Sequence, residues 1–303
     1  MIEIKELTKR FEDKTAIDRL NCTVKNGCIY GLVGANGSGK STLLRTVCGI
    51  YKPDAGQVLI DGVPVWENAE AKAKIAFVSD EPYFPNGATL ARMMKLYGSF
   101  FPDFDREKFK KLAAAFSLDL KKRVGAFSKG MRRQAATALA LSRKADYMLF
   151  DETFDGLDPI ARGYVKNLIT EEVLNRGAAA VITSHSLREL EDTCDQLALL
   201  HNGGLVFESD IADLKTAKFK VQIAFSDDYD RNRFDGIDVL HYEKHGAVCN
   251  MIVQGDREET EEKLKALGPL LLDILPLSLE EVFTYEAEAF GYTFSTEDKE
   301  ETK

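Results

Sequence analysis

Cysteine is scarce in this chain, and long apolar runs are missing. Five of the 303 residues are cysteine, an odd number, and no two of them form a C-x-x-C pair. A disulfide scaffold, a zinc site and a thiol redox motif are therefore excluded as interpretations. We interpret the cysteines as small buried side chains in a reducing compartment; they are Cys22, Cys28, Cys48, Cys194 and Cys249.

No apolar run approaches the ~18–20 residues that a membrane-spanning helix needs. The first residues, 1–7, begin at once on an alternating pattern and lack the apolar centre of a signal peptide. We therefore expect that no segment crosses a bilayer, which leaves open that the protein contacts another protein that does.

Basic residues are outnumbered. The chain has 40 Lys and Arg against 49 Asp and Glu, a formal net charge of −9. Proteins that bind nucleic acid through general charge attraction usually present a basic face. We therefore expect no nucleic-acid partner.

Strands and helices alternate through the first part of the chain. This alternation predicts an α/β fold with a mixed sheet covered on both faces. The expected strands include 28–33, 75–78, 147–150 and 178–183, and the expected helices include 41–50, 130–141 and 160–175.

The pattern changes near Asp210. Short alternating segments at 219–225, 239–242 and 247–253 precede a charged helix at 257–267. We interpret 1–210 as one domain, 211–294 as a small α+β domain, and the polar end, 295–303, as a disordered tail.

The segment from Gly34 to Thr42 fits G-x-x-x-x-G-K-[ST] and stands between an apolar strand and a helix, which is the context that this motif requires. Its glycines let backbone N–H groups surround phosphate oxygens, and the helix that follows adds its positive end. Lys40 reaches the outer phosphates and Ser41 ligates Mg²⁺. The candidate ATP-binding residues here are Gly34, Asn36, Gly37, Ser38, Gly39, Lys40, Ser41 and Thr42.

An apolar strand, 147–150, ends in the adjacent acids Asp151 and Glu152. Ligands gather at the carboxyl ends of parallel strands. We expect Asp151 to hold magnesium through water and Glu152 to polarise the attacking water as a general base. Such a strand alone is common; behind a phosphate-binding loop it is a much stronger indication.

Further motifs resemble those of ATP-binding-cassette (ABC) ATPases over residues 1–210. Residues 127–134 (FSKGMRRQ) are similar to the signature motif, 155–159 (DGLDP) to the D-loop, and 183–185 (TSH) to the switch histidine. The remainder resembles the C-terminal part of exporter-type bacterial subunits, and 65–68 with 77–83 resemble the YtrB-type subgroup. The resemblance implies a P-loop NTPase fold with an antiparallel β subdomain and a helical subdomain.

The resemblance assigns roles by position. Phe11 takes the place of the aromatic residue that stacks on adenine. Ser128 and Gly130 would contact the γ-phosphate of ATP held by a second copy, so that two nucleotides lie between two head-to-tail subunits. His185 would sense and position the γ-phosphate, and Asp158 would couple the two sites.

Four positions depart from the family pattern. Thr153 stands where a proline commonly follows the catalytic Glu152, and we expect little loss of activity because threonine can adopt that backbone. Asp80 stands where a glutamine is usual; it offers an oxygen to Mg²⁺, but with a charge. Asp155 replaces a small polar residue at the start of the D-loop. Lys129 replaces a second glycine, and either adds positive charge near phosphate or points to solvent.

The function implied by the resemblance is Mg²⁺-dependent ATP hydrolysis that drives a separate transmembrane permease, with export favoured. The expected partners are a second ATPase subunit, identical or different, and the permease, which would hold the protein at the inner face of the cell membrane. The alternative is a soluble ABC-type ATPase that acts on nucleic acid or in cluster assembly. The acidic charge, the single phosphate-binding loop and the lack of a heptad run favour the transporter.

Overall fold

A computed structural model describes residues 1–212, 218–278 and 280–282. Their contacts divide the chain into two compact units, Met1–Glu208 and a second unit that begins at Ser209. The tail expected at 295–303 lies outside the described residues. Each unit is described here by itself.

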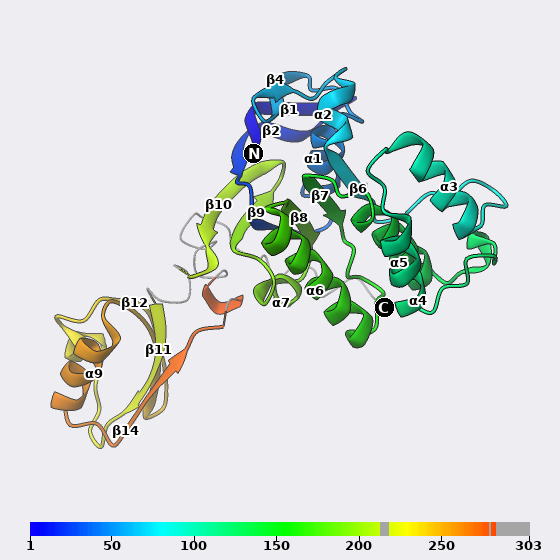
Figure 1. The fold of residues 1–303 in the computed structure, drawn as a ribbon. Helices are drawn as coiled ribbons and strands as arrows, with labels where there is room; N and C mark the ends of the chain where they lie inside the picture. The colour runs from blue at the N-terminus through cyan, green and yellow to red at the C-terminus, as the bar shows by residue number, and fades with distance from the viewer. Residues whose placement is uncertain (213–217, 279, 283–303) are drawn as a thin grey trace, which may run out of the picture. The chain divides into compact units, whose positions relative to one another are not determined.

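The centre of the first unit is a six-stranded sheet in the order β10-β9-β3-β8-β7-β6 (Figure 1). β3 pairs in parallel with β8 and β9, and β7 pairs in parallel with β6 and β8. β3, β7 and β8 are buried at every residue, as expected of strands that are covered on both faces. The strands are β3 (Ile29–Val33), β6 (Ile75–Val78), β7 (Tyr147–Asp151), β8 (Ala179–Ser184), β9 (Gln196–His201) and β10 (Gly204–Asp210).

Helix α1 (Lys40–Val47) lies between this sheet and a second, antiparallel one. The second sheet has the order β2-β1-β4-β5 and consists of β1 (Ile2–Phe11), β2 (Lys14–Val24), β4 (Ala55–Ile60) and β5 (Val63–Pro64). Asp61 and Gly62 have φ of 53° and 79° and form a two-residue hairpin turn between β4 and β5. One apolar core joins both sheets to Leu43, Leu44 and Val47 of α1.

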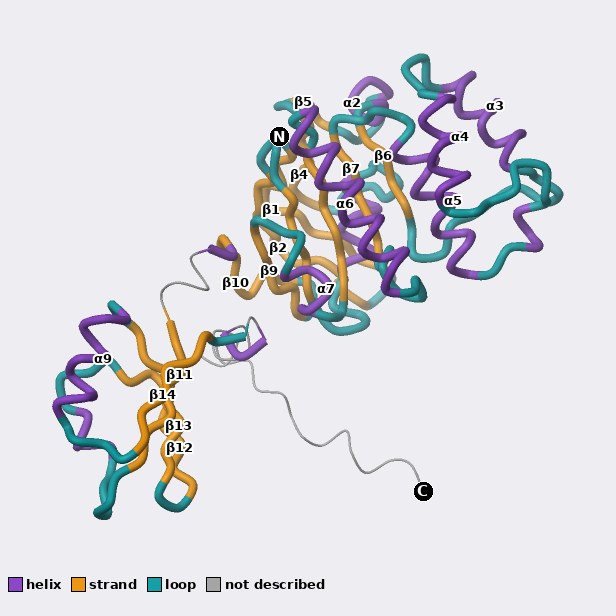
Figure 2. Tube along the Cα trace, turned by 60° about the horizontal axis from the view of Figure 1, so that its bottom comes forward, coloured by secondary structure: helices purple, strands orange, loops and turns teal. Residues whose placement is uncertain are grey.

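Helices α6 (Pro159–Arg176) and α7 (Leu187–Glu191) contact β8. Figures 1 and 2 show them on the central sheet away from the antiparallel one. α6 buries one side chain per turn, with Ala161, Val165, Ile169 and Val173 inward. The central sheet is therefore covered on both faces, as the sequence predicts.

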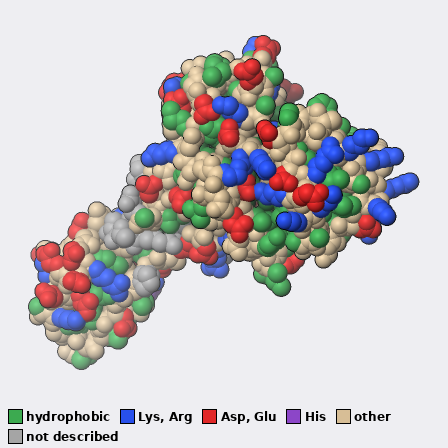
Figure 3. Space-filling model, viewed as in Figure 1, with side chains coloured by type: hydrophobic (Ala, Val, Ile, Leu, Met, Phe, Trp, Pro, Cys, Tyr) green, Lys and Arg blue, Asp and Glu red, His purple; other side chains and the backbone are tan. Residues whose placement is uncertain are grey.

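A helical region follows β6. It contains α3 (Leu90–Phe100), α4 (Arg106–Ala115) and α5 (Lys129–Leu141), and the short α2 (Ala69–Ala73) precedes β6. Thr89, Asp105 and Ser128 each accept a backbone N–H and so begin these three helices. In Figure 3, Lys and Arg side chains gather over the part of the surface that carries α3 and α4, with acidic side chains among them. This surface is therefore of mixed charge.

The second unit is a four-stranded antiparallel sheet in the order β12-β13-β11-β14. It contains β11 (Lys218–Ala224), β12 (Val239–His245), β13 (Val248–Gln254), β14 (Leu271–Pro276) and the helix α9 (Arg257–Ala266). Alternate residues of β11 and β13 pack with Leu264 of α9 and with an aromatic cluster of Phe225, Tyr229 and Phe234. Among the described residues of both units, no helix is both long and apolar enough to span a membrane.

Candidate nucleotide-binding site

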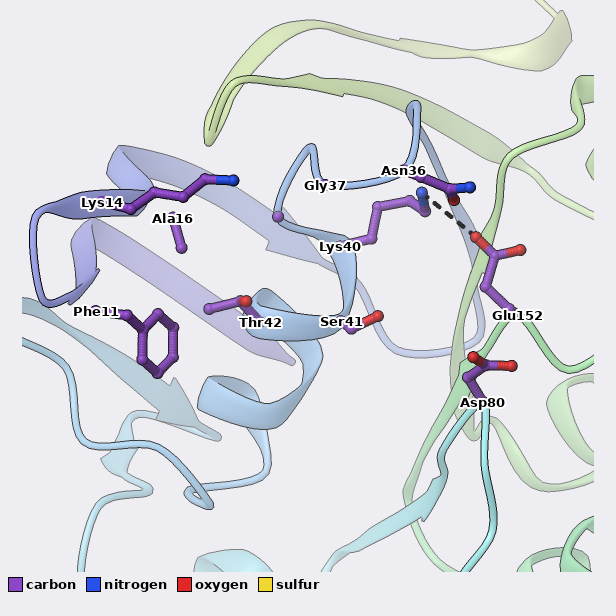
Figure 4. Close-up of a pocket in the computed structure, with 11 residues that line it drawn as sticks. Phe11, Lys14, Ala16, Asn36, Gly37, Lys40, Ser41, Thr42, Asp80 and Glu152 are labelled. Atoms are coloured by element: carbon purple, nitrogen blue, oxygen red, sulfur yellow. Dashed lines mark ion pairs between the residues drawn. The ribbon is translucent and has the colours of Figure 1, made fainter. Parts of the chain in front are cut away.

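A pocket opens in the first unit where the antiparallel sheet, the loop after β3 and the ends of β6 and β7 meet (Figure 4). The β1–β2 hairpin supplies one end, and acidic side chains from beyond β6 and β7 supply the other. The lining residues are Phe11, Lys14, Ala16, Asn36, Gly37, Gly39, Lys40, Ser41, Thr42, Asp80 and Glu152.

The loop before α1 has a shape that only glycine permits. Gly39, at the N-cap of α1, has φ 112°, and a Cβ there would lie 2.5 Å from the carbonyl oxygen of Ala16. A Cβ on Gly34 would lie 2.3 Å from the carbonyl oxygen of Leu200. No side chain caps the start of α1. Its first N–H groups are therefore available to an anion, which is the arrangement that binds phosphate at helix N-termini.

Lys40 is almost fully buried at the base of this loop. Its Nζ donates to the carbonyl oxygens of Gly34 at 2.6 Å and Ala35 at 3.1 Å. It also lies 3.3 Å from Oε1 of Glu152, an ion pair drawn in Figure 4. The loop thus holds a buried cation at its centre, facing a carboxylate across the pocket.

Asp151 is fully buried at the end of β7. Its Oδ1 accepts hydrogen bonds from the Ser41 hydroxyl at 3.0 Å and the Thr183 hydroxyl at 2.9 Å. Its Oδ2 is buried and has no hydrogen-bond partner among the residues that the structure describes. Burial raises the pKa of Asp151, and the two hydroxyl hydrogen bonds only partly oppose this. A buried carboxylate with a spare oxygen is a ready cation ligand.

Glu152 has φ 47°, a left-handed conformation that costs a non-glycine residue energy and is concentrated at functional sites. Its backbone N–H donates to the Thr183 hydroxyl at 3.0 Å. Its Oε2 accepts a hydrogen bond from Nδ1 of His185 at 2.9 Å, because an ionised carboxylate only accepts. Glu152 is therefore held between Lys40 and His185, at the edge of the pocket.

Phe11 lines the other end of the pocket, beside Lys14 and Ala16. The Phe11 ring packs edge-on against Tyr51 with a centroid distance of 5.2 Å, and 41% of the residue remains exposed. A flat, partly exposed aromatic ring at this end fits the stacking role implied by the sequence. Lys14, on β2, also lines the pocket, but no residue of β2 was proposed as a binding residue from the sequence.

Several predicted residues are not in this pocket. Gly34 and Ser38 are buried inside the loop. Ser128 caps α5, accepting the N–H of Met131 at 3.2 Å, and does not line the pocket. Asp158 lies at the start of α6, where its Oδ1 accepts two backbone N–H groups. Gly130 also lies outside, on α5.

Two of the departures from the family pattern, Asp80 and Asp155, meet at one buried side chain, Arg133. The Arg133 guanidinium donates to Asp80 and to Asp155. Lys129, which was expected either near phosphate or in solvent, has a side chain that is 56% exposed and lies 3.4 Å from the carboxylate of Asp155. Sequence reasoning did not single out Arg133 or Thr183. Thr183 lies near the carboxyl end of the apolar strand β8, opposite Asp151 of β7, and that position was the available signal.

Comparison with known proteins agrees with this geometry. The family model described as "ABC transporter" matches residues 17–155. The chain is 30% identical to the ABC transporter ATP-binding protein YtrB of Bacillus subtilis over 284 residues, covering 93% of this chain and 97% of that protein. It is 31% identical to the bacitracin transport ATP-binding protein BcrA of Bacillus licheniformis, covering 71% of each chain.

Solved structures share the fold of the first unit. An ATP-binding subunit of an ABC transporter aligns with a TM-score of 0.65 at 24% identity, covering 71% of this chain and 91% of that one. The dimeric ATP-binding cassette MJ0796 bound to ADP and Pi aligns with a TM-score of 0.62 at 21% identity, covering 70% and 99%. These matches confirm the predicted fold class.

Proposed function

The chain belongs to the ABC transporter family as an ATP-binding, ATP-hydrolysing subunit. From this premise we propose which residues bind and hydrolyse ATP, and which partners the subunit works with. One observation carries the proposal: the buried Lys40 and the strained Glu152 face each other at 3.3 Å in the pocket that follows the phosphate-binding loop. The comparisons support a transporter ATPase rather than an ATPase acting on nucleic acid or in cluster assembly.

ATP would lie along the pocket with adenine on Phe11 and its phosphates over the start of α1. Lys40 would exchange its contact with Glu152 for the β- and γ-phosphates. Glu152 would then accept a proton from the attacking water. His185, which is hydrogen-bonded to Oε2 of Glu152, would orient the Glu152 carboxylate and sense the γ-phosphate.

The residues beside the loop fit a magnesium ion. Oxygen ligands are those that Mg²⁺ prefers, and the spare Oδ2 of Asp151 lies on the carboxyl group that already binds the Ser41 hydroxyl. Ser41 and Asp151 would hold the ion, with Asp80 from across the pocket. When bound, the ion neutralises charge on the β- and γ-phosphates.

The active form would be a head-to-tail pair of subunits, identical or different. Ser128 and Gly130, which lie outside this chain's own pocket, would contact the γ-phosphate held by the partner, and Asp158 would couple the two sites. A permease would hold the pair at the inner face of the cell membrane. The name of one relative, the Nod factor export ATP-binding protein I of Burkholderia lata, favours export.

Lys40→Ala tests the nucleotide site. We expect loss of tight ATP binding in an equilibrium titration and loss of phosphate release, because the buried cation that faces the phosphates is gone. Normal ATP affinity in this variant would contradict the assignment of the loop.

Size-exclusion chromatography of Glu152→Gln tests the pairing. Adding Mg-ATP should shift this variant from monomer to dimer, and Ser128→Arg in the same background should abolish the shift. A dimer that persists with Ser128→Arg would contradict the proposed role of Ser128. Co-purification with a multi-span membrane protein tests the permease.

A further inference from the structure

A charged cluster beside the nucleotide pocket joins three separate segments of the first unit. Arg133 lies on α5, Asp80 follows β6, and Asp155 follows β7. The Arg133 side chain has no exposed surface, whereas the carboxyl groups of Asp80 and Asp155 remain 43% and 46% exposed. The cation is therefore the buried centre of the cluster, and the two acids form its rim.

Every nitrogen of the guanidinium has a partner in the two acidic residues. Nε donates to the carbonyl oxygen of Asp80 at 3.1 Å, and Nη2 donates to its carboxylate. Nη1 donates to the carbonyl oxygen of Asp155 and lies 3.1 Å from its Oδ2. Each segment is thus held by both backbone and side chain, which the planar fork of arginine allows and lysine does not.

The two acidic residues belong to different functional segments. Asp80 lines the nucleotide pocket, on the side of Glu152. Asp155 begins the D-loop. α5 itself begins at Ser128, and a Cβ on Gly130 would lie only 3.0 Å from the carbonyl oxygen of Gly156, so the start of α5 lies directly on the D-loop.

We propose that Arg133 is a positioning residue that ties the Asp80 segment and the D-loop to α5, so that the pocket edge and the partner-facing segments move as one body. The inference rests on the proposed function, in which Ser128 of α5 acts on a second subunit's nucleotide. Moving either acid alone would leave a buried cation short of a partner, which is strongly unfavourable. Burial opposes ionisation of Asp155, but the hydrogen bonds and positive charges of Arg133 and Lys129 together outweigh it and keep the pKa of Asp155 below its ordinary value.

The first test uses hydrogen exchange on the full-length protein without nucleotide, so it does not depend on hydrolysis. Arg133→Gln should speed exchange in residues 79–83 and 152–157 by about tenfold or more, because both segments lose their tether. The reporters are the N–H groups of Asp155 and Leu157, which donate to the carbonyl oxygens of Glu152 and Phe154, each at 3.2 Å. Arg132→Gln, one residue earlier on α5, is the matched control and should exchange as the wild type does. Unchanged exchange in both segments would overturn the proposal.

The second test asks whether the charges act together. Arg133→Gln should lower phosphate release by about tenfold or more while ATP affinity is kept, since it leaves two acids without their cation. Adding Asp155→Asn should restore part of the loss. A loss that Asp155→Asn leaves unchanged would show that Arg133 acts only through packing, and would overturn the proposal.

If Arg133→Gln does not fold, Asp155→Asn alone still decides the question. It alters a half-exposed side chain, and it should speed exchange in 152–157 while 79–83 keeps its Asp80 contact. Unchanged exchange in 152–157 would overturn the proposal. Failure of the wild type to hydrolyse ATP would instead contradict the proposed function. The exchange experiment contains no nucleotide, so its result would still test the role of Arg133.

Discussion

Replacing Glu152 by glutamine removes one negative charge from the nucleotide pocket and leaves the side chain nearly the same size. The carboxylate has two partners, Lys40 at 3.3 Å from Oε1 and His185 at 2.9 Å from Oε2. A glutamine keeps an oxygen acceptor toward one of them but has no basicity. The variant therefore separates nucleotide binding from the proton-transfer step.

We expect Glu152→Gln to lower the rate of hydrolysis and to raise the affinity for ATP. A positioned general base contributes about 10²–10⁴-fold to a rate. Loss of hydrolysis by that factor corresponds to about 2.7–5.5 kcal/mol of activation free energy. ATP binding should instead become tighter, because the Glu152 carboxylate competes with the phosphates for Lys40 and also repels the phosphates. Lys40 keeps its two carbonyl contacts. We expect ATP to bind about threefold to tenfold more tightly, or about 0.7–1.4 kcal/mol.

The assay pairs phosphate release under saturating Mg-ATP with an equilibrium titration of ATP on the same preparation. Glu171→Gln, an exposed acid on α6, is the control and should leave both quantities unchanged. Undiminished turnover by Glu152→Gln would remove Glu152 from the role of base and point to another acid, Asp80 first. Weaker ATP binding would refute the competition for Lys40.

Three further predictions follow from the geometry. Gly39→Ala should lower the melting temperature more than Gly37→Ala, because both have positive φ but only the Cβ at 39 meets a backbone oxygen, that of Ala16 at 2.5 Å; equal melting temperatures would contradict this. Ending the chain after Asp210 should leave ATP affinity unchanged, since none of the described residues beyond it lines the pocket; loss of binding in a fragment with native circular dichroism would show that the boundary is misplaced. Burial raises the pKa of Cys22 to about 12, so iodoacetamide at pH 8 should modify it slowly in the native protein and quickly after denaturation; mass spectrometry of the alkylated peptide checks this.

Much of the fold could be predicted from local pattern. The fully apolar strands β3, β7 and β8 and the helices α1, α5 and α6 were expected within a few residues of their bounds. Helix α3 ends at Phe100, shortly before Pro102, because proline does not continue a helix. Strands β9 and β10 were not assigned from the sequence. β10 is partly exposed, and its mixed pattern carries no clear period.

The sequence by itself determined the phosphate-binding loop, the paired acids after β7 and the family, since these depend on residues that are adjacent in the chain and need no partner to be identified. Only the tertiary structure decided that Arg133 is buried and that it joins Asp80 to Asp155, 75 positions apart in the sequence. An arginine near the start of an amphipathic helix has the same local pattern whether it faces water or two carboxylates. The surroundings of Arg133 are set by segments that are distant in the sequence and are brought to it by the fold. The charge balance of this buried site therefore depends on contacts between those segments, which no single stretch of sequence reveals.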